Sequence, residues 1–104
     1  MVTKKTVVMW RQIPAQVIIA KGRKKAKRIL SDKFQKAIDQ AAMVSGRADT
    51  DGYLEDWSRV DETLNDPADI VDLAKLEASR LEEEYNDERL SHLVKNGGLH
   101  DDQL

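Results

Sequence analysis

Residues 6–20 read TVVMWRQIPAQVIIA, and this stretch, the most apolar of the chain, decides the fold. Its two ends, 6–10 and 16–20, are rich in β-branched residues and have the composition of strands. Pro14 lies between them, and because proline has no N–H to donate to a neighbouring strand, it marks a turn or a bulge. The stretch therefore predicts a β-hairpin with an irregular connection.

Beyond residue 30, apolar residues recur at the spacing of helices. One stripe predicts a helix at about 32–45, with Ser31 as its N-cap and Gly46 just past its end. A second stripe predicts a long helix at about 67–85 that begins at Asn65-Asp66-Pro67. Each of these helices has a single apolar face with which to cover the hairpin.

Two shorter segments complete the chain. Asn86-Asp87 starts a further short helix, and Gly97-Gly98 ends it. Residues 53–60 fit two structures equally well. Tyr53 and Trp57 share one face of a helical turn, whereas the residues from Trp57 to Val60 also suit a strand that joins the sheet.

These elements predict an α+β fold in which an N-terminal β-hairpin, part of a small antiparallel sheet, packs against two main helices. The length of 104 residues suits one domain, which we expect over residues 1–95. Residues 96–104 are then expected to form a flexible C-terminal tail.

The composition excludes several kinds of function. The chain has no Cys, so thiolate metal sites and Cys nucleophiles are absent. Its apolar stretch is interrupted by Arg11, Gln12 and Gln16 and is too polar to cross a membrane, so we expect a cytoplasmic protein. His92 and His100 share no helical face, and the acidic runs resemble solvated helix surface. We therefore expect no catalytic residue, metal or cofactor, and an interaction protein rather than an enzyme.

The net charge of -2 conceals a strong division along the chain. Residues 1–36 carry eleven Lys and Arg but only one acid, Asp32, while the remaining residues carry six Lys and Arg and eighteen acids. Such an asymmetry indicates an interaction surface. The two halves can pair within one chain or between copies, so a homo-oligomer is one of the expected states.

Most of the excess positive charge lies in a basic run, expected to be a loop, between the hairpin and the first helix. It consists of Lys21, Arg23, Lys24, Lys25, Lys27 and Arg28. Such a cluster supplies the charge that binds nucleic-acid phosphates. However, no aromatic residue that would stack on bases lies within it. The alternative is a solvated loop that pairs with the acidic C-terminal helices.

A second candidate site lies around the hairpin connection. Arg11, Gln12 and Gln16 are polar residues within the apolar stretch, next to Trp10. A guanidinium beside amides and an aromatic ring is suited to binding a carboxylate or phosphate. The alternative is that these side chains simply lie on the solvated face of the hairpin.

The segment WRQIPAQV, followed by FQKAID and YLEDW, resembles a small bacterial family called virulence factor, whose domain also occurs in conserved virulence factor C of staphylococci. The resemblance covers about residues 5–60. It implies a small cytoplasmic protein associated with folate-linked one-carbon and methyl-transfer metabolism, and hence an accessory subunit of a methyltransferase-type enzyme. It implies no particular reaction. The positions matching the family's pattern are Trp10, Arg11, Ile13, Pro14, Gln16, Tyr53 and Trp57.

The sequence thus favours a non-enzymatic accessory protein that contacts a protein partner. Its expected contact surface consists of the hairpin connection, residues 11–16, and the basic run, with Trp10, Tyr53 and Trp57 beside them. Nucleic-acid binding by the basic run and binding of a small anionic ligand at Arg11 are the alternatives.

Overall fold

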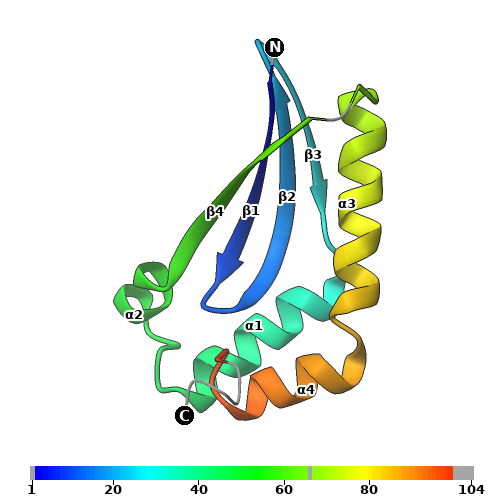
Figure 1. Ribbon diagram of the computed structural model, residues 1–104. Coiled ribbons are helices and arrows are strands. Elements are labelled where there is room, and N and C mark those ends of the chain that lie inside the picture. Colours follow the sequence, from blue (N-terminus) through cyan, green and yellow to red (C-terminus); the bar gives the residue numbers. More distant parts are fainter. Residues whose placement is uncertain (1, 66, 100–104) are drawn as a thin grey trace.

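The computed structural model describes residues 2–65 and 67–99, which form one antiparallel sheet and a set of helices around it (Figure 1). The sheet has the strand order β3-β2-β1-β4. Its strands are β1 (Thr3–Trp10), β2 (Ile13–Lys21), β3 (Lys24–Ile29) and β4 (Trp57–Leu64). The helices are α1 (Asp32–Val44), α2 (Thr50–Glu55), α3 (Ile70–Glu84) and α4 (Asp87–Lys95). The predicted α+β fold is therefore confirmed.

The predicted hairpin is formed by β1 and β2, which are joined by the two-residue turn Arg11-Gln12. The register shifts along the hairpin, because Val8 lies opposite Gln16 while Met9 lies opposite Pro14. The extra residue of β2 makes a β-bulge, which is where a strand can accept proline without losing a ladder hydrogen bond. The irregularity predicted from Pro14 is thus a bulge inside the strand.

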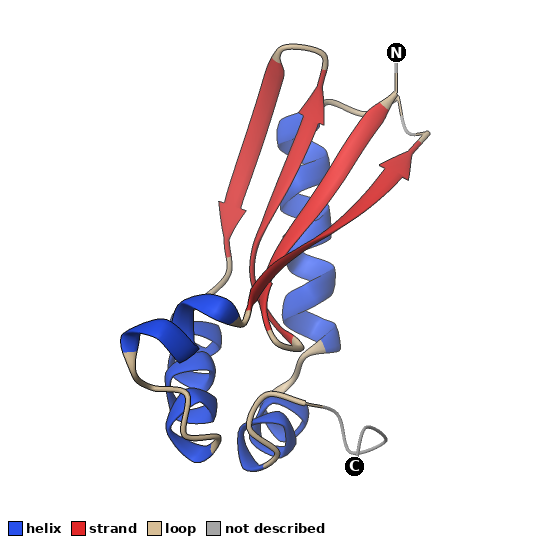
Figure 2. Ribbon diagram, turned by 90° about the vertical axis from the view of Figure 1, so that its left-hand side faces the viewer, coloured by secondary structure: helices blue, strands red, loops and turns tan. Residues whose placement is uncertain are grey.

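Helix α3 covers one face of the sheet, which we call the inner face (Figure 2). Val7, Val17 and Ile19 of the sheet are buried there against Ile70 and Leu73 of α3. The opposite, outer face has no helix over most of its length in the part of the chain that the structure describes. One face is therefore part of the core and the other is open.

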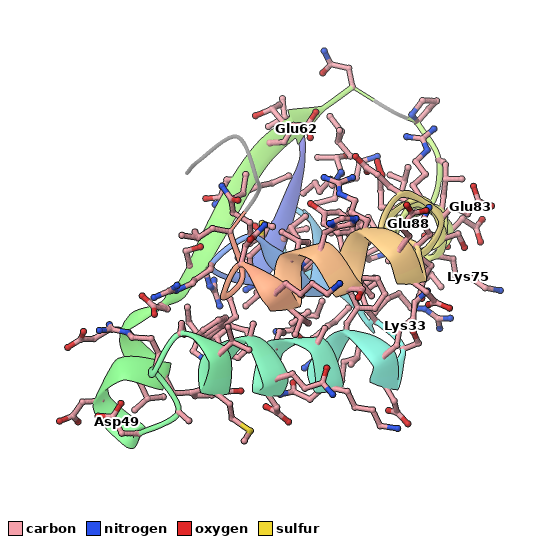
Figure 3. The ribbon with its side chains drawn as sticks, turned by 90° about the horizontal axis from the view of Figure 1, so that it is seen from below. Lys33, Asp49, Glu62, Lys75, Glu83 and Glu88 are labelled. Carbon is pink, nitrogen blue, oxygen red and sulfur yellow. The ribbon has the colours of Figure 1, made fainter. Side chains whose placement is uncertain are left out.

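A second core lies at the end of the sheet that carries the β1–β2 turn. Trp10 and Ile13 are buried there against Phe34 and Ile38 of α1 and Leu93 of α4. Figure 3 shows α1 and α4 side by side beneath the sheet. The molecule thus has two packing centres, one between α3 and the inner face and one between the hairpin turn and the α1–α4 pair.

Most helix boundaries agree with the sequence prediction. α1 ends as expected, with Gly46 at a φ of +74°. In α4 the side chain of Asn86 accepts a hydrogen bond from the backbone N–H of Arg89, as an N-cap does. α3 begins at Ile70 with Asp69 as its N-cap, so its predicted start at Pro67 was wrong by one helical turn, because the buried stripe starts only at Ile70.

Two other segments differ from or refine the prediction. Residues 53–60 contain both of the structures that the sequence left open, since α2 ends at Glu55 and β4 starts at Trp57. The basic run is not a loop. Lys21 is the last residue of β2, Arg23 lies in the tight turn that follows, and the other four cations belong to β3, where Ala26 packs against the inner-face core.

The predicted C-terminal tail, residues 96–104, falls partly outside the described residues. Asn96–Leu99 are described, and Gly97 and Gly98 are buried. Residues 100–104 lie outside the described part of the chain, so their predicted flexibility stays a prediction.

Candidate functional site

The aromatic residues of the first candidate site form one cluster at the β1–β2 turn. Trp10 is fully buried, and its Nε1 donates a hydrogen bond to the backbone oxygen of Tyr53 over 2.8 Å. The rings of Trp10 and Tyr53 stack with centroids 5.9 Å apart, and Trp57 packs edge-on against Tyr53 at 5.8 Å. This cluster joins the hairpin to α2 and the start of β4.

Arg11 is bound on two sides by its own chain. Its Nε donates to Oδ2 of Asp56 at 3.1 Å, and its Nη1 donates to the backbone oxygen of Gly97 at 2.9 Å. Its backbone N–H donates to the backbone oxygen of Asp56. Arg11 has a φ of +53°, a region that non-glycine residues rarely adopt unless surrounding contacts hold them there. These hydrogen bonds supply such contacts.

A second guanidinium shares the same carboxylate. The Nε of Arg47 donates to Oδ2 of Asp56 at 3.0 Å, and its Nη2 donates to Glu55 at 2.9 Å. These hydrogen bonds raise the pKa of Arg47 above its ordinary value, and the one to Asp56 has the larger effect. Asp56 therefore lies between two arginines that come from distant parts of the chain.

The glycines after α4 complete this arrangement. The backbone oxygen of Gly98 accepts a hydrogen bond from the backbone N–H of Gln12 at 2.9 Å. A Cβ on Gly98 would lie 3.0 Å from the ring of Trp10, and one on Gly97 would lie 2.9 Å from Cβ of Ser45. Both residues have positive φ. The sequence identified this pair only as a helix stop and missed its contact with the turn. We call Trp10, Arg11, Asp56, Gly97 and Gly98 the turn clamp.

The structure thus brings together four of the residues proposed for the first site: Trp10, Arg11, Tyr53 and Trp57. Gln12 adjoins them in the turn and is half-buried. Gln16 does not join the cluster, because the bulge separates it from the turn and it lies opposite Val8 within the sheet. The donors of Arg11 described above are directed toward the protein's own oxygen atoms, so the geometry here stabilises the fold.

The second candidate site has the opposite character. We call Lys21, Arg23, Lys24, Lys25, Lys27 and Arg28 the basic edge, because β3 is an edge strand of the sheet. Lys21 is half-buried and the others are exposed. Among the residues that the structure describes, none of the six forms a hydrogen bond or ion pair through its side chain.

The acidic helices bind other cations instead. Glu77 of α3, only 5% exposed, pairs with Lys5 of β1 at 3.3 Å and with Arg80 at 3.4 Å. Asp87 of α4 pairs with Lys33 of α1 at 3.4 Å. The alternative in which the basic run pairs internally with the acidic helices is therefore not seen among the described residues. β3 lies beside α3, and Ala26 packs in the core that α3 helps to form, so the missing ion pairs do not result from a separation of the two elements.

The outer face continues the basic edge across the sheet. Residues opposite one another in antiparallel strands share a face, so the pairing defines three rows across it. These rows are Ile29–Gln16–Val8–Arg59, Lys27–Ile18–Thr6–Asp61 and Lys25–Ala20–Lys4–Thr63. The outer face thus combines aliphatic side chains with lysines, and it carries one acid in these rows.

That acid, Asp61, is held by its neighbours on β1. Its Oδ1 accepts a hydrogen bond from the hydroxyl of Thr6 at 2.6 Å, and its Oδ2 lies 3.4 Å from Nζ of Lys4. The hydrogen bond from Thr6, followed by the charges of Lys4 and Arg59, lowers the pKa of Asp61 below its ordinary value. Asp61 is therefore ionised over the whole neutral range.

Metal-ligand clusters and membrane-spanning helices are both absent from the described residues. No group of three or more His, Asp or Glu side chains there is arranged to hold a metal ion. No helix there has the length and apolar character needed to cross a membrane.

The chain was compared with known proteins and protein families. No curated protein and no solved structure gives a significant match. The family model described as virulence factor matches residues 8–94, from β1 into α4, and so reaches beyond the segment that carries the sequence resemblance. Since this match covers most of the chain, the protein belongs to the virulence factor family.

Proposed function

We propose that the protein is a small cytoplasmic accessory protein that binds a negatively charged surface of a partner protein through the basic edge and the adjoining outer face. The observation that carries the proposal is the set of six cations, from the end of β2 through the turn into β3, without a partner in the described chain. By contrast, Lys5, Arg11 and Arg47 are all paired with acids. Among the described residues, the densest charge of the chain is thus left without a partner.

Protection of the exposed sheet edge against unwanted pairing explains only part of this charge. Lysines on an edge strand discourage unwanted pairing with other sheets, and a few are enough for that purpose. Here six cations lie within eight residues, so their mutual repulsion opposes folding without a compensating contact. An acidic partner would supply that contact and would be attracted at long range.

The aliphatic residues of the outer face support a protein as the partner. Ile29 is 74% exposed at the end of β3, and Ile18 and Val8 lie on the adjoining strands. A surface with an apolar centre and a charged rim is typical of protein interfaces. Following the family resemblance, we propose that the partner is a methyltransferase-type enzyme of folate-linked one-carbon metabolism.

Nucleic-acid binding is the second candidate, and the same free cations favour it. Phosphates would be neutralised by the basic edge whatever the base sequence. However, each of the five aromatic side chains of the chain is buried or half-buried, so none is exposed to stack on a base. The outer face therefore supports a protein partner better than single-stranded RNA or DNA.

A small anionic ligand at Arg11 is supported less well. The guanidinium of Arg11 already donates to the carboxylate of Asp56 on one side and to the backbone oxygen of Gly97 on another. An anion would have to displace a bound carboxylate that two arginines share. The contacts of the turn clamp thus give Arg11 a role in stability.

The test uses the full chain as bait and reverses charge in two places. In Lys25→Glu/Lys27→Glu two outer-face lysines of the basic edge become acidic. In the control, Lys36→Glu/Lys75→Glu, the same net charge change is made at exposed helical lysines that lie away from the sheet; Lys75 points outward in Figure 3. Partners are captured from nuclease-treated native lysate and identified by mass spectrometry. The complex is then reconstituted from the purified proteins.

We expect the wild type and the control to retain a stoichiometric protein partner, and the basic-edge variant to lose it. A partner that binds the basic-edge variant as well as the wild type would overturn the proposal. Fluorescence anisotropy with a DNA or RNA oligonucleotide, at about 50 and 200 mM salt, tests the second candidate. Tight, salt-sensitive binding that depends on Lys25 and Lys27, with no protein captured, would establish that candidate instead.

A further inference from the structure

The edge of the sheet opposite β3 is formed by β4, and it differs from the basic edge in charge and in exposure. Figure 2 shows β4 next to β1, and among residues 2–65 and 67–99 no further strand lies on its other side, in agreement with the strand order. Val60 at the middle of β4 is 54% exposed although it lies opposite the buried Val7. An edge strand that exposes an aliphatic, uncharged residue tends to pair with a strand of another molecule.

The residues beside Val60 carry opposite charges. Arg59 and Asp61 flank it and lie together on the outer face, since each is opposite an outer-face residue of β1. Within the described chain Arg59 forms no ion pair or hydrogen bond through its side chain. Asp61 accepts a hydrogen bond from Thr6 and forms an ion pair with Lys4, and each of its carboxylate oxygens can accept a further hydrogen bond.

From this arrangement we propose that β4 pairs antiparallel with β4 of a second copy, centred on Val60. Two-fold symmetry then places Val60 opposite Val60 of the partner subunit and Arg59 opposite Asp61 of the partner subunit, twice. Ser58 lies opposite Glu62 of the partner subunit in the same register. Arg59 of each copy thereby gains a carboxylate partner at the distance of directly opposed side chains.

Charge selects this register over its neighbours. A symmetric antiparallel pair must be centred on a residue, because the hydrogen-bonding groups of a strand alternate in direction. Centring the pair on Arg59 would oppose two arginines, and centring it on Asp61 would oppose two aspartates. Only the Val60 register among these three replaces both repulsions with attractions.

The basic edge cannot form the equivalent dimer. Centring a β3 pair on Ala26 would oppose Lys25 to Lys27 and Lys24 to Arg28, and centring it on Lys25 or on Lys27 would oppose two lysines. A β4-mediated dimer instead forms one continuous eight-stranded sheet, with both outer faces on the same side and a basic edge at each end. The dimer would present two copies of the proposed partner surface, although the pairing itself does not depend on that function.

The direct test uses the absence of cysteine from the chain. Val60→Cys introduces a single thiol on the two-fold axis, where it faces its own copy closely enough for a disulfide. Ile29→Cys is the control, because this side chain is more exposed than Val60 but lies at the end of the basic edge. The measured quantities are the mass of the wild type and the fraction of each variant that crosslinks under mild oxidation.

We expect a wild-type mass of twice 11.8 kDa, rapid crosslinking of Val60→Cys and little of Ile29→Cys. Arg59→Glu opposes two acids and should weaken the dimer about tenfold or more, and Arg59→Glu/Asp61→Arg should recover much of the loss by exchanging the charges. A monomer at all concentrations, equal crosslinking of both cysteine variants, or a mass that keeps growing beyond the dimer would overturn the proposal.

Discussion

At the β1–β2 turn a guanidinium is bound on two sides by its own chain, whereas one hairpin further along six cationic side chains have no partner in the described residues. Both regions combine cations with a tight turn, and both are candidate sites by composition. The difference shows that a polar residue within an apolar stretch is often bound by the protein itself. Charged side chains without a partner in the fold therefore indicate a binding surface more reliably than a high local charge does.

Trp10→Ala gives the largest expected effect, because it empties the centre of the turn clamp. Loss of a fully buried indole is expected to lower the free energy of unfolding by about 3–5 kcal/mol. Urea denaturation followed by circular dichroism measures it. Trp57→Ala, at the half-buried rim of the same cluster, is the control and should cost clearly less. Equal losses would show that Trp10 is no special anchor.

Gly98→Ala tests the close approach of the α4 end to the turn. A Cβ there meets the buried ring of Trp10 at 3.0 Å, and the backbone φ is +94°. We expect a loss of about 2–3 kcal/mol. Gly46→Ala separates the two causes, since its φ is +74° but no atom lies within 4 Å of the added Cβ. That control should cost only about 1 kcal/mol, the conformational part. If both variants lose the same free energy of unfolding, the close contact with Trp10 makes no contribution to the effect of Gly98→Ala.

Charge reversal at the basic edge tests whether this region, unlike the turn clamp, contributes little to stability. Because Lys25 and Lys27 form no ion pair with the described chain, Lys25→Glu/Lys27→Glu should not lower the free energy of unfolding by more than about 0.5 kcal/mol. Urea denaturation at low and moderate salt measures the change. A large destabilisation would mean that the basic edge, like the turn clamp, is a structural feature.

The smallest expected effect is a pH dependence at Asp61. The hydrogen bond from Thr6 is the main cause that lowers the pKa of Asp61 below its ordinary value, so the folded state favours the ionised carboxyl. The resulting stabilisation is present above the unfolded pKa and is lost as the pH falls through the folded one. Asp61→Asn should therefore show a shallower loss of stability than the wild type below about pH 4. Parallel acid-unfolding curves for the two proteins would contradict this assignment.

The sequence predicted the hairpin, α1 and α4 because their signals are local. The bulge follows from Pro14, and the ends of α1 and α4 follow from Gly46 and Asn86. The strand character of β3 was missed because only Ala26 and Ile29 are apolar among its six residues, so no alternation is visible. It is a strand because its backbone pairs with β2.

The turn clamp lay beyond sequence reasoning for a different reason. Arg11 and Gly97 are 86 residues apart, and nothing in either neighbourhood indicates that they meet. The carboxylate that Arg11 binds, Asp56, has no distinguishing local pattern, and its position depends on the change from α2 to β4. Such contacts are set by the packing of whole elements.

The most direct test of the central claim compares Arg11→Ala with Lys25→Glu/Lys27→Glu in two measurements, unfolding by urea and binding to the captured partner. Arg11→Ala should lose about 1–3 kcal/mol of stability because two hydrogen bonds from a charged group disappear, and it should still bind the partner while folded. The basic-edge variant should keep its stability and lose the partner. Loss of partner binding in folded Arg11→Ala, with binding retained in the basic-edge variant, would contradict the account.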